Sequence, residues 1–96
     1  MANPHKPTRY NVLILPSARR QLRQLERTHH HQQRGNLVSA ILSLGDNPRP
    51  VAARRLVNRE EWRLRVGDHR ILFLIDDQQL TVTVTAIAHR RDVYRR

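Results

Sequence analysis

The sequence predicts an α+β fold of the order β-α-α-β-β-β, in which an antiparallel sheet carries a helical pair on one face. Two observations predict it. After one short strand, apolar residues of the first half recur at helical spacing, whereas in the second half they alternate with polar residues along three segments. Turn-forming residues separate those segments. With 96 residues, the chain is predicted to be a single domain, residues 1–96.

The first half is predicted to hold one strand and two helices. Residues 1–8 are polar, contain two prolines and are expected to be a flexible arm. Residues 9–15 alternate as a strand. Pro16 begins a helix with arginines on its polar faces, and a second helix follows, for which Gly45 is expected to be the C-terminal cap. Residues 46–50 hold two prolines and are predicted to be a loop.

The second half is predicted to form three antiparallel strands with a defined register. A two-residue turn at Gly67-Asp68 makes Arg65 face Arg70, and a hairpin centred on Asp77-Gln78 makes Phe73 face Val82. One face becomes an apolar wall for the helices, formed by Trp62, Leu64, Val66, Ile71, Phe73, Ile75, Leu80, Val82, Val84 and Ala86. The opposite face collects Arg63, Arg65, Arg70, Leu72, Leu74, Thr83 and Thr85.

The composition narrows the function to binding of a polyanion. The chain has 18 Lys and Arg against 8 Asp and Glu, a formal net charge of +10, and every cation except Lys6 is arginine. Arginine grips phosphate with a planar fork, so nucleic acid or an acidic protein is the expected partner. No cysteine is present for a disulfide or a thiolate metal site. No signal-peptide core or bilayer-spanning stretch is seen, which predicts a cytoplasmic protein with no membrane partner.

The facing pair Arg65 and Arg70 is a candidate anion site. Like charges directly opposite on a sheet destabilise it, so the pair is expected to hold an anion between its guanidinium groups. The alternative is that each arginine pairs with a carboxylate, such as that of Asp68 or Glu60.

The C-terminal segment, residues 88–96, is basic with one aromatic residue, a pattern typical of nucleic-acid binding. The last strand is expected to end beside Arg70. Arg65, Arg70, Arg90 and Tyr94 are therefore predicted to converge, with His89 nearby. The expected RNA-binding residues around them are Arg63, Arg91, Arg95 and Arg96.

The segment WRLRVGDHRILFLID at 62–76, followed by HRRDVYR at 89–95, resembles the signature of the RelE family of toxin–antitoxin toxins. The stretch from Leu44 through Asn47-Pro48-Arg49-Pro50 to Arg55-Leu56 is similar too, so the resemblance covers about residues 9–95. It implies a microbial RNase-like fold that cleaves messenger RNA, usually in the ribosomal A site. It also implies a cognate antitoxin that wraps the toxin.

The resemblance also implies roles for individual residues. Arg70 matches the arginine that contacts the scissile phosphate, Arg90 a second catalytic arginine, and Tyr94 a C-terminal tyrosine. Arg63 and Arg65 stand where some members have basic residues, often lysines. The carboxylate base of some ribosome-acting relatives has no clear counterpart, because that stretch reads Arg54-Arg55-Leu56. His89 is a possible substitute, and the base stays open between His89, Tyr94 and a ribosomal RNA group.

The function expected from these observations is that of a type II toxin, a metal-independent endoribonuclease in which the 2′-OH attacks the scissile phosphate. No cofactor or metal is expected: the run His29-His30-His31 falls at a helix junction beside no acid or cysteine, and His69 is expected to be structural. Two alternatives remain. A ParE-like gyrase inhibitor would share the fold, although Arg70, Arg90 and Tyr94 argue against it. A non-catalytic RNA- or ribosome-binding domain would bind RNA without cutting it.

Overall fold

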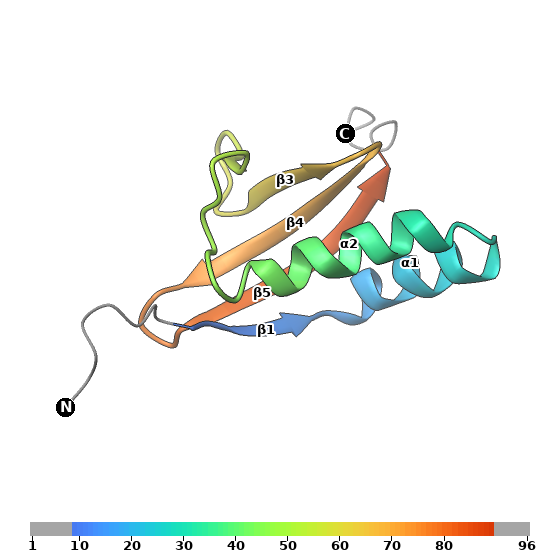
Figure 1. The fold of residues 1–96 in the computed structure, drawn as a ribbon. Helices are drawn as coiled ribbons and strands as arrows, with labels where there is room; N and C mark the ends of the chain where they lie inside the picture. The colour runs from blue at the N-terminus through green and yellow to red at the C-terminus, as the bar shows by residue number, and fades with distance from the viewer. Residues whose placement is uncertain (1–8, 90–96) are drawn as a thin grey trace.

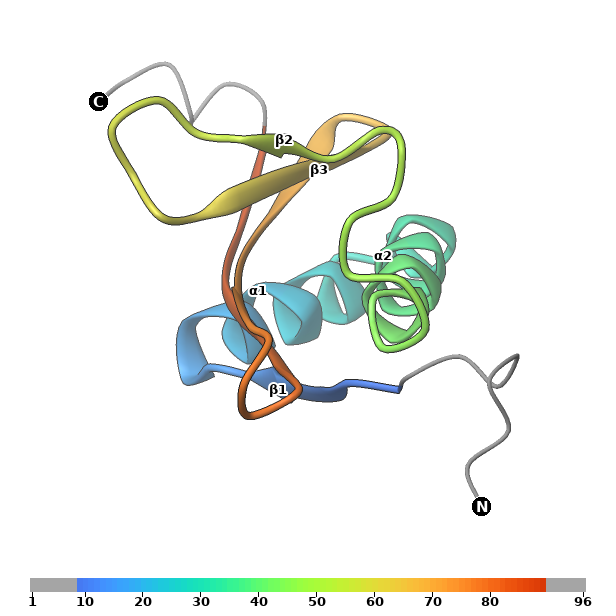
Figure 2. The ribbon, with the colours of Figure 1, turned by 90° about the vertical axis from the view of Figure 1, so that its left-hand side faces the viewer.

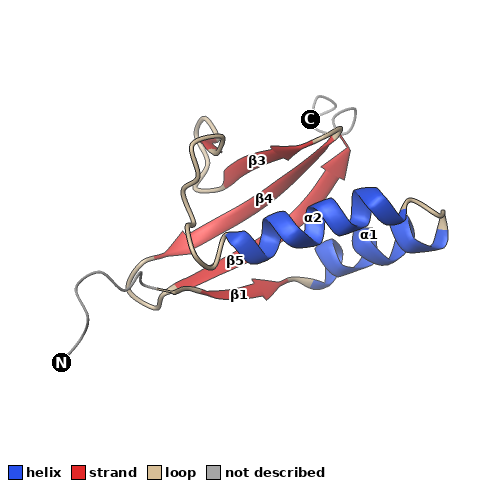
Figure 3. Cartoon of the chain, in the orientation of Figure 1, coloured by secondary structure: helices blue, strands red, loops and turns tan. Residues whose placement is uncertain are grey.

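The computed structural model describes residues 9–89, so the predicted arm and residues 90–96 lie outside the described part of the chain. The described elements confirm the α+β class and add one short strand that was not predicted (Figures 1 and 3). In chain order they are β1 (Asn11–Ile14), α1 (Pro16–Arg27), α2 (His31–Ser43), β2 (Arg54–Arg55), β3 (Trp62–Val66), β4 (His69–Asp76) and β5 (Thr81–His89).

The strands form one sheet in the order β1-β5-β4-β3-β2, and both helices lie on one of its faces (Figure 1). Strands β3 to β5 are antiparallel, as predicted, and the additional strand β2 pairs with β3 in the same way, but β1 adds to β5 in parallel. The expectation of a wholly antiparallel sheet is therefore wrong at this edge. In the chain, three other strands separate β1 from β5. In the sheet, β1 lies along the outer edge of β5, where its side chains Val12 and Ile14 complete the apolar layer.

The β3–β4 hairpin has the predicted register. Val66 pairs with His69, Arg65 with Arg70 and Trp62 with Phe73. The turn is formed by Gly67-Asp68, and Gly67 has a φ of 59°, a left-handed conformation that glycine adopts without steric strain.

The predicted β4–β5 register is wrong by two residues. Phe73 pairs with Val84 rather than Val82, and Asp76 pairs with Thr81 across a longer turn. The Asp76 carboxylate accepts the backbone N–H groups of Gln78 and Gln79, at 3.0 Å each, and so stabilises that turn.

A β-bulge then shifts the β5 alternation. The register changes between Leu72 and Phe73, which pair with Ala86 and Val84 and leave Thr85 as the extra residue. Beyond this bulge the faces of β5 are exchanged relative to the prediction. Ile87 is buried in the core in place of Ala86, and Ala86 moves to the opposite face. Leu80, also expected in the core, lies in the turn and is 38% exposed.

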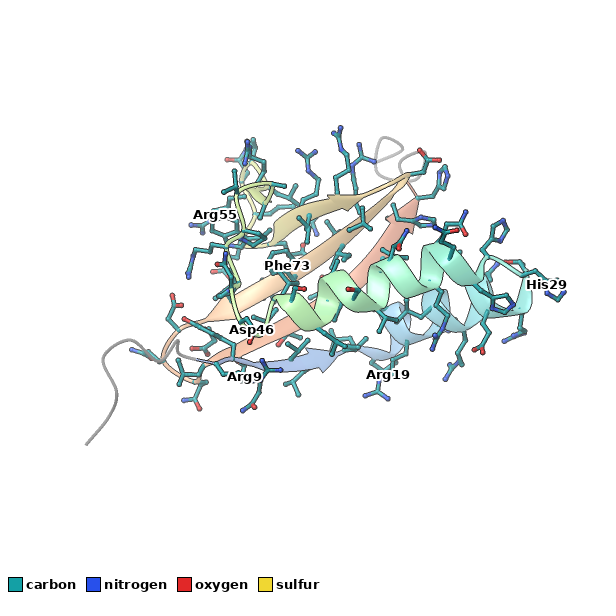
Figure 4. The ribbon with its side chains drawn as sticks, in the orientation of Figure 1. Arg9, Arg19, His29, Asp46, Arg55 and Phe73 are labelled. Atoms are coloured by element: carbon teal, nitrogen blue, oxygen red, sulfur yellow. The ribbon has the colours of Figure 1, made fainter. Side chains whose placement is uncertain are left out.

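The core lies between the helical pair and the sheet, with Phe73 at its centre (Figure 4). Gly45 follows α2 but is not a left-handed cap, because among the described glycines only Gly67 has positive φ. A Cβ on Gly45 would lie 3.1 Å from the Tyr10 carbonyl oxygen, and the Gly45 carbonyl accepts the Tyr10 N–H at 2.7 Å. Close backbone approach to the start of β1 is thus the reason for this glycine.

A polar cluster joins β1, the 46–50 loop and the β4–β5 turn. Arg49 donates two hydrogen bonds to the Asp77 carboxylate, at 2.8 and 3.1 Å, and the Tyr10 hydroxyl donates a third at 2.6 Å. The Arg49 guanidinium also lies 5.6 Å from the centre of the Trp62 ring. The hydrogen bonds from Arg49, followed by that from Tyr10, lower the pKa of Asp77 to about 2.

Candidate nucleic-acid interface

The face of the sheet that points away from the helices, here called the open face, carries a row of arginines. Arg54 pairs with Arg63 across β2 and β3, and Arg65 pairs with Arg70 across β3 and β4. Residues paired across an antiparallel sheet point to the same side, so the alternation along β3 puts all four on the open face. Four arginines on three adjacent strands make this face strongly positive.

In the described part of the chain, Arg65 does not have the carboxylate partner that the alternative reading required of it, and Arg63 has none either. The ion pairs between described residues join Arg9 to Asp46, Arg34 to Glu26, Arg49 to Asp77 and Arg59 to Glu61. Neither Arg63 nor Arg65 takes part in an ion pair within residues 9–89. Arg54, in contrast, is held by its own loop, because its guanidinium donates to the carbonyls of Val51 and Ala53 at 2.6 and 2.9 Å.

Arg70 differs from Arg65 in its environment. Arg65 is exposed, whereas only 3% of the Arg70 surface is accessible. The expectation that Arg70 projects freely from the open face is therefore corrected: its side chain is packed into the sheet beside buried Leu72. The 3% refers to the whole residue, so the guanidinium is enclosed together with its stem, and the surrounding groups hold it in one orientation. Fixed orientation is what an electrostatic catalyst requires.

His89 does not join the arginines on the open face. Since the bulge exchanges the faces of β5, His89 pairs with His69 on the helix side, while Arg70 pairs with Ala88. The two imidazole rings meet edge to face with their centres 5.4 Å apart. Burial, followed by the nearby His89, lowers the pKa of His69. As predicted, His89 is close to Arg70 in the strand register, but its side chain points to the opposite face of the sheet.

Glu61 is a polar residue of the open face that the sequence analysis missed. It precedes Arg63 by two positions, so the same alternation places it on that face. Its Oε2 accepts a 2.6 Å hydrogen bond from the hydroxyl of Thr85, the bulge residue, and its Oε1 pairs with Arg59. The Glu61 side chain is only 15% exposed. Extending the predicted β3–β4 register by one more pair, beyond Trp62, would have placed Glu61 on the open face.

A groove of about 490 Å³ lies next to the arginines. Its lining combines an apolar floor from β4 and β5 with polar side chains of α1. The loop between β2 and β3, which extends away from α2 (Figure 2), adds two apolar side chains and one arginine. The lining residues are Ser17, Arg20, Gln21, Leu56, Val57, Arg59, Leu72, Ala86, Ile87 and Ala88. Ala88 is the cross-strand partner of Arg70, so the groove and the arginine row form one continuous surface.

The sequence and the fold match a family of toxins. Residues 12–94 match the family model described as ParE toxin of type II toxin–antitoxin system, parDE. The chain belongs to the RelE/ParE superfamily of toxin–antitoxin toxins. Toxin RelG of Mycobacterium tuberculosis is 31% identical over 93 residues, which cover 91% of this chain and 98% of RelG.

Solved structures agree with this assignment. The RelBE2 toxin–antitoxin complex of M. tuberculosis contains a chain that is 27% identical and superimposes with a TM-score of 0.71, covering 88% of this chain and 95% of that one. A chain of the archaeal RelE–RelB complex from Pyrococcus horikoshii is 17% identical, with a TM-score of 0.70 and coverage of 84% and 94%, and so shows the fold alone.

The remaining predicted site residues of this superfamily toxin lie outside the described residues: Arg90, Arg91, Tyr94, Arg95 and Arg96. The His29–His31 run lies at the helix junction as predicted, exposed at the turn shown in Figure 4. Within residues 9–89, no group of three metal-ligating side chains is positioned to hold a metal ion. No helix there is both long and apolar enough to cross a membrane.

Proposed function

We propose that this toxin is a metal-independent endoribonuclease that cleaves messenger RNA in the cytoplasm, in the ribosomal A site. The observation that carries the proposal is the facing pair Arg65 and Arg70. Two cations directly opposite on a sheet repel each other, and Arg65 has no ion-pair partner among the described residues. A phosphate between them would remove that repulsion.

The chemistry needs no cofactor because RNA carries its own nucleophile. The 2′-oxygen attacks the adjacent phosphorus, the 2′-OH proton passes to a base, and the bond from phosphorus to the 5′-oxygen breaks. The departing 5′-oxygen takes up a proton, which leaves a 2′,3′-cyclic phosphate and a 5′-OH. Arg65 and Arg70 would stabilise the negative charge that accumulates on the phosphoryl oxygens, which is usually the largest catalytic contribution. Arg63 and the C-terminal arginines would hold the flanking phosphates.

The structure narrows the candidates for the proton acceptor. His89 lies on the helix side, so we do not assign it this role. Arginine is a poor base because its pKa exceeds 12. Both carboxylate oxygens of Glu61 already accept a hydrogen bond, which favours a role in holding Arg59 and Thr85. We therefore propose Tyr94 or a group of the ribosomal RNA as the base, with Arg90 as a second charge donor.

We also propose that a cognate antitoxin restrains the toxin. The M. tuberculosis and P. horikoshii relatives were solved as toxin–antitoxin complexes. A chain with a net charge of +10 is suited to an acidic partner. Expression in bacteria should therefore require co-expression of the neighbouring acidic reading frame. High and harmless expression of the toxin alone would count strongly against this proposal.

The experiment that tests the nuclease is a cleavage assay on messenger RNA, with and without ribosomes. We expect cleavage that persists in excess EDTA and yields 2′,3′-cyclic phosphate or 3′-phosphate ends with 5′-OH ends. Ribosome integrity should be checked in the same samples by sedimentation. Loss of cleavage on chelation that Zn²⁺ or Mn²⁺ restores, in samples whose ribosomes stayed intact, would overturn metal independence. Binding without scission under every condition would instead identify a non-catalytic RNA-binding domain.

A second candidate function is inhibition of DNA gyrase, which the ParE description of the matching family favours. It predicts loss of gyrase supercoiling at toxin concentrations that leave RNA intact. The two activities are separable in one preparation, because supercoiling by gyrase and cleavage of a labelled RNA can be measured in parallel.

A further inference from the structure

Helix α1 carries a second basic surface, which adjoins the open face at the groove but is formed by a different element. Arg19, Arg20, Arg23 and Arg27 are all exposed, while Ala18 and Leu22 of the same helix are buried. Arg19 projects outward from α1 in Figure 4. We call these four residues the α1 arginine surface. Along the helix axis they extend over about 12 Å.

This surface is unfavourable for the isolated helix. Arg19, Arg23 and Arg27 are spaced four residues apart, and like charges at that spacing repel each other on a helix. The first turn has no acidic residue to complement the helix dipole. Glu26, the one acid of α1, pairs with Arg34 of α2 at 3.8 Å. None of the four arginines has a carboxylate partner within residues 9–89.

The chemistry of the surface identifies its partner. Protein interfaces have an apolar or aromatic centre, but the exposed large apolar residues of the described chain lie outside α1. For the same reason the surface has nothing to insert into a membrane. Single-stranded RNA is held largely by stacking on aromatic rings, and α1 has none. Base-paired RNA is recognised largely through its phosphate backbone, which arginine side chains can contact.

We propose that the α1 arginine surface binds the phosphate backbone of base-paired RNA, at a site distinct from the open face. Arg20 lies on this surface and also lines the groove, so the two basic regions adjoin along one side of the molecule. A single strand could then occupy the open face while a neighbouring duplex is bound by α1. The proposal does not depend on cleavage and would hold for a chain that only binds RNA.

The test compares two double variants that remove equal charge. In one, Arg23→Gln and Arg27→Gln remove two arginines of the α1 surface, and glutamine keeps the helix propensity. In the control, Arg9→Gln and Arg55→Gln remove two exposed arginines elsewhere. Each variant is co-expressed with the neighbouring acidic reading frame, separated from its product in urea and refolded. The probe is an RNA duplex of about 16 base pairs with 2′-O-methyl riboses, which blocks cleavage.

Affinity for the duplex falls as salt rises, so the slope of log affinity against log salt is negative. In the α1 variant we expect this slope to become shallower by about 2, since each lost phosphate contact removes about 1 from its magnitude. A single-stranded 2′-O-methyl RNA of equal length should show a smaller loss, and the control variant should retain duplex binding. The variant with Arg23→Lys and Arg27→Lys keeps both charges and should therefore keep the wild-type slope. If it also loses duplex binding, the loss is due to a folding defect and not to the missing charges.

Three outcomes would overturn the proposal. If the α1 variant and the control lose equal affinity for the duplex, the loss reflects net charge alone. If the α1 variant loses equal affinity for single-stranded and duplex RNA, the α1 arginine surface is not a separate duplex-binding site. Finally, polyglutamate or vesicles rich in phosphatidylserine could bind the wild-type chain more tightly than the duplex and lose affinity in the α1 variant. That result would assign the surface to an acidic protein or to a membrane instead.

Discussion

His89 and Arg70 lie at the same end of the sheet but point to opposite faces. Arg70 pairs with Ala88, and His89 pairs with His69 one position further along. The single bulge residue Thr85 produces this arrangement, because one extra residue exchanges the two faces of a strand. A candidate general base is thereby removed from the candidate phosphate site, although the two residues are close in the register.

The first prediction concerns His89. His89→Gln should leave the rate of RNA cleavage nearly unchanged, since the imidazole lies on the helix side, against His69. Loss of a general base would instead cost about 100-fold to 10,000-fold. The measurement is the single-turnover cleavage rate across pH 5 to 9. A loss of about 100-fold across this pH range would return His89 to the reaction.

The second prediction concerns Arg70. Arg70→Ala should slow cleavage by at least about 100-fold, the cost of losing one transition-state charge donor. Because Arg70 is only 3% exposed, the same change should also lower the free energy of unfolding, by about 1–3 kcal/mol. Urea denaturation measures the second effect, and cleavage is then measured where the variant is fully folded.

Arg70→Lys is the matched control for that variant. It keeps the charge and most of the buried stem but not the two-pronged guanidinium. Stability should recover toward wild type while cleavage stays impaired. If cleavage recovers together with stability, Arg70 acts through the fold and not through the phosphate.

The sequence predicted those parts of the site that local patterns determine. The Gly67-Asp68 turn fixes the β3–β4 hairpin, and every pair from Trp62–Phe73 to Val66–His69 follows from it. The same alternation predicted which β3 residues share a face with Arg70. Helix α1 begins at Pro16 for an equally local reason, because proline fits the first helical turn.

The parts that were predicted wrongly depend on contacts distant in the chain. The position of the bulge is linked to Thr85, whose hydroxyl donates to Glu61 from 24 residues away. The parallel position of β1 depends on which edge of the finished sheet remains available. Burial of Arg70 depends on packing around β4, and alternation alone predicts a face but not its depth.

The third prediction concerns acid stability and Asp77. Its pKa is about 2 in the folded chain, below the ordinary value of 3.8, because Arg49 and Tyr10 donate to it. A depressed carboxylate pKa stabilises the fold above the unfolded value and loses that effect as protons bind. The contribution should be complete above pH 3.8 and lost between there and about pH 2.

Asp77→Asn isolates this contribution. Urea unfolding curves of wild type and variant should differ at pH 5 to 7 and approach each other as the pH falls toward 2. Glu60→Gln, at an exposed acid in the loop before β3, controls for the general loss of one negative charge. Parallel curves for wild type and Asp77→Asn over the whole range would show that Asp77 is not a determinant of acid stability.

The last prediction is that Arg65 and Arg70 act on one phosphate and therefore fail additivity. Arg65→Ala should slow cleavage, yet it should leave the protein as stable as wild type or more stable by a few tenths of a kcal/mol, since it removes a cross-strand repulsion. Residues that act on one group couple, so the double variant should lose less activity than the product of the single losses.

A double-mutant cycle on the single-turnover cleavage rate measures this coupling, and it is best run with Arg70→Lys to keep the fold intact. Arg63→Ala provides the comparison, because Arg63 lies on the same face but pairs with Leu72 and Arg54, not with Arg70. Its effect should combine with that of Arg70→Lys nearly multiplicatively. If the effects of Arg65→Ala and Arg70→Lys on the cleavage rate also multiply, or if Arg65→Ala markedly destabilises the fold, the two arginines do not share a phosphate. In that case Arg65 would bind a flanking phosphate, and Arg70 would remain the sole described charge donor at the scissile one.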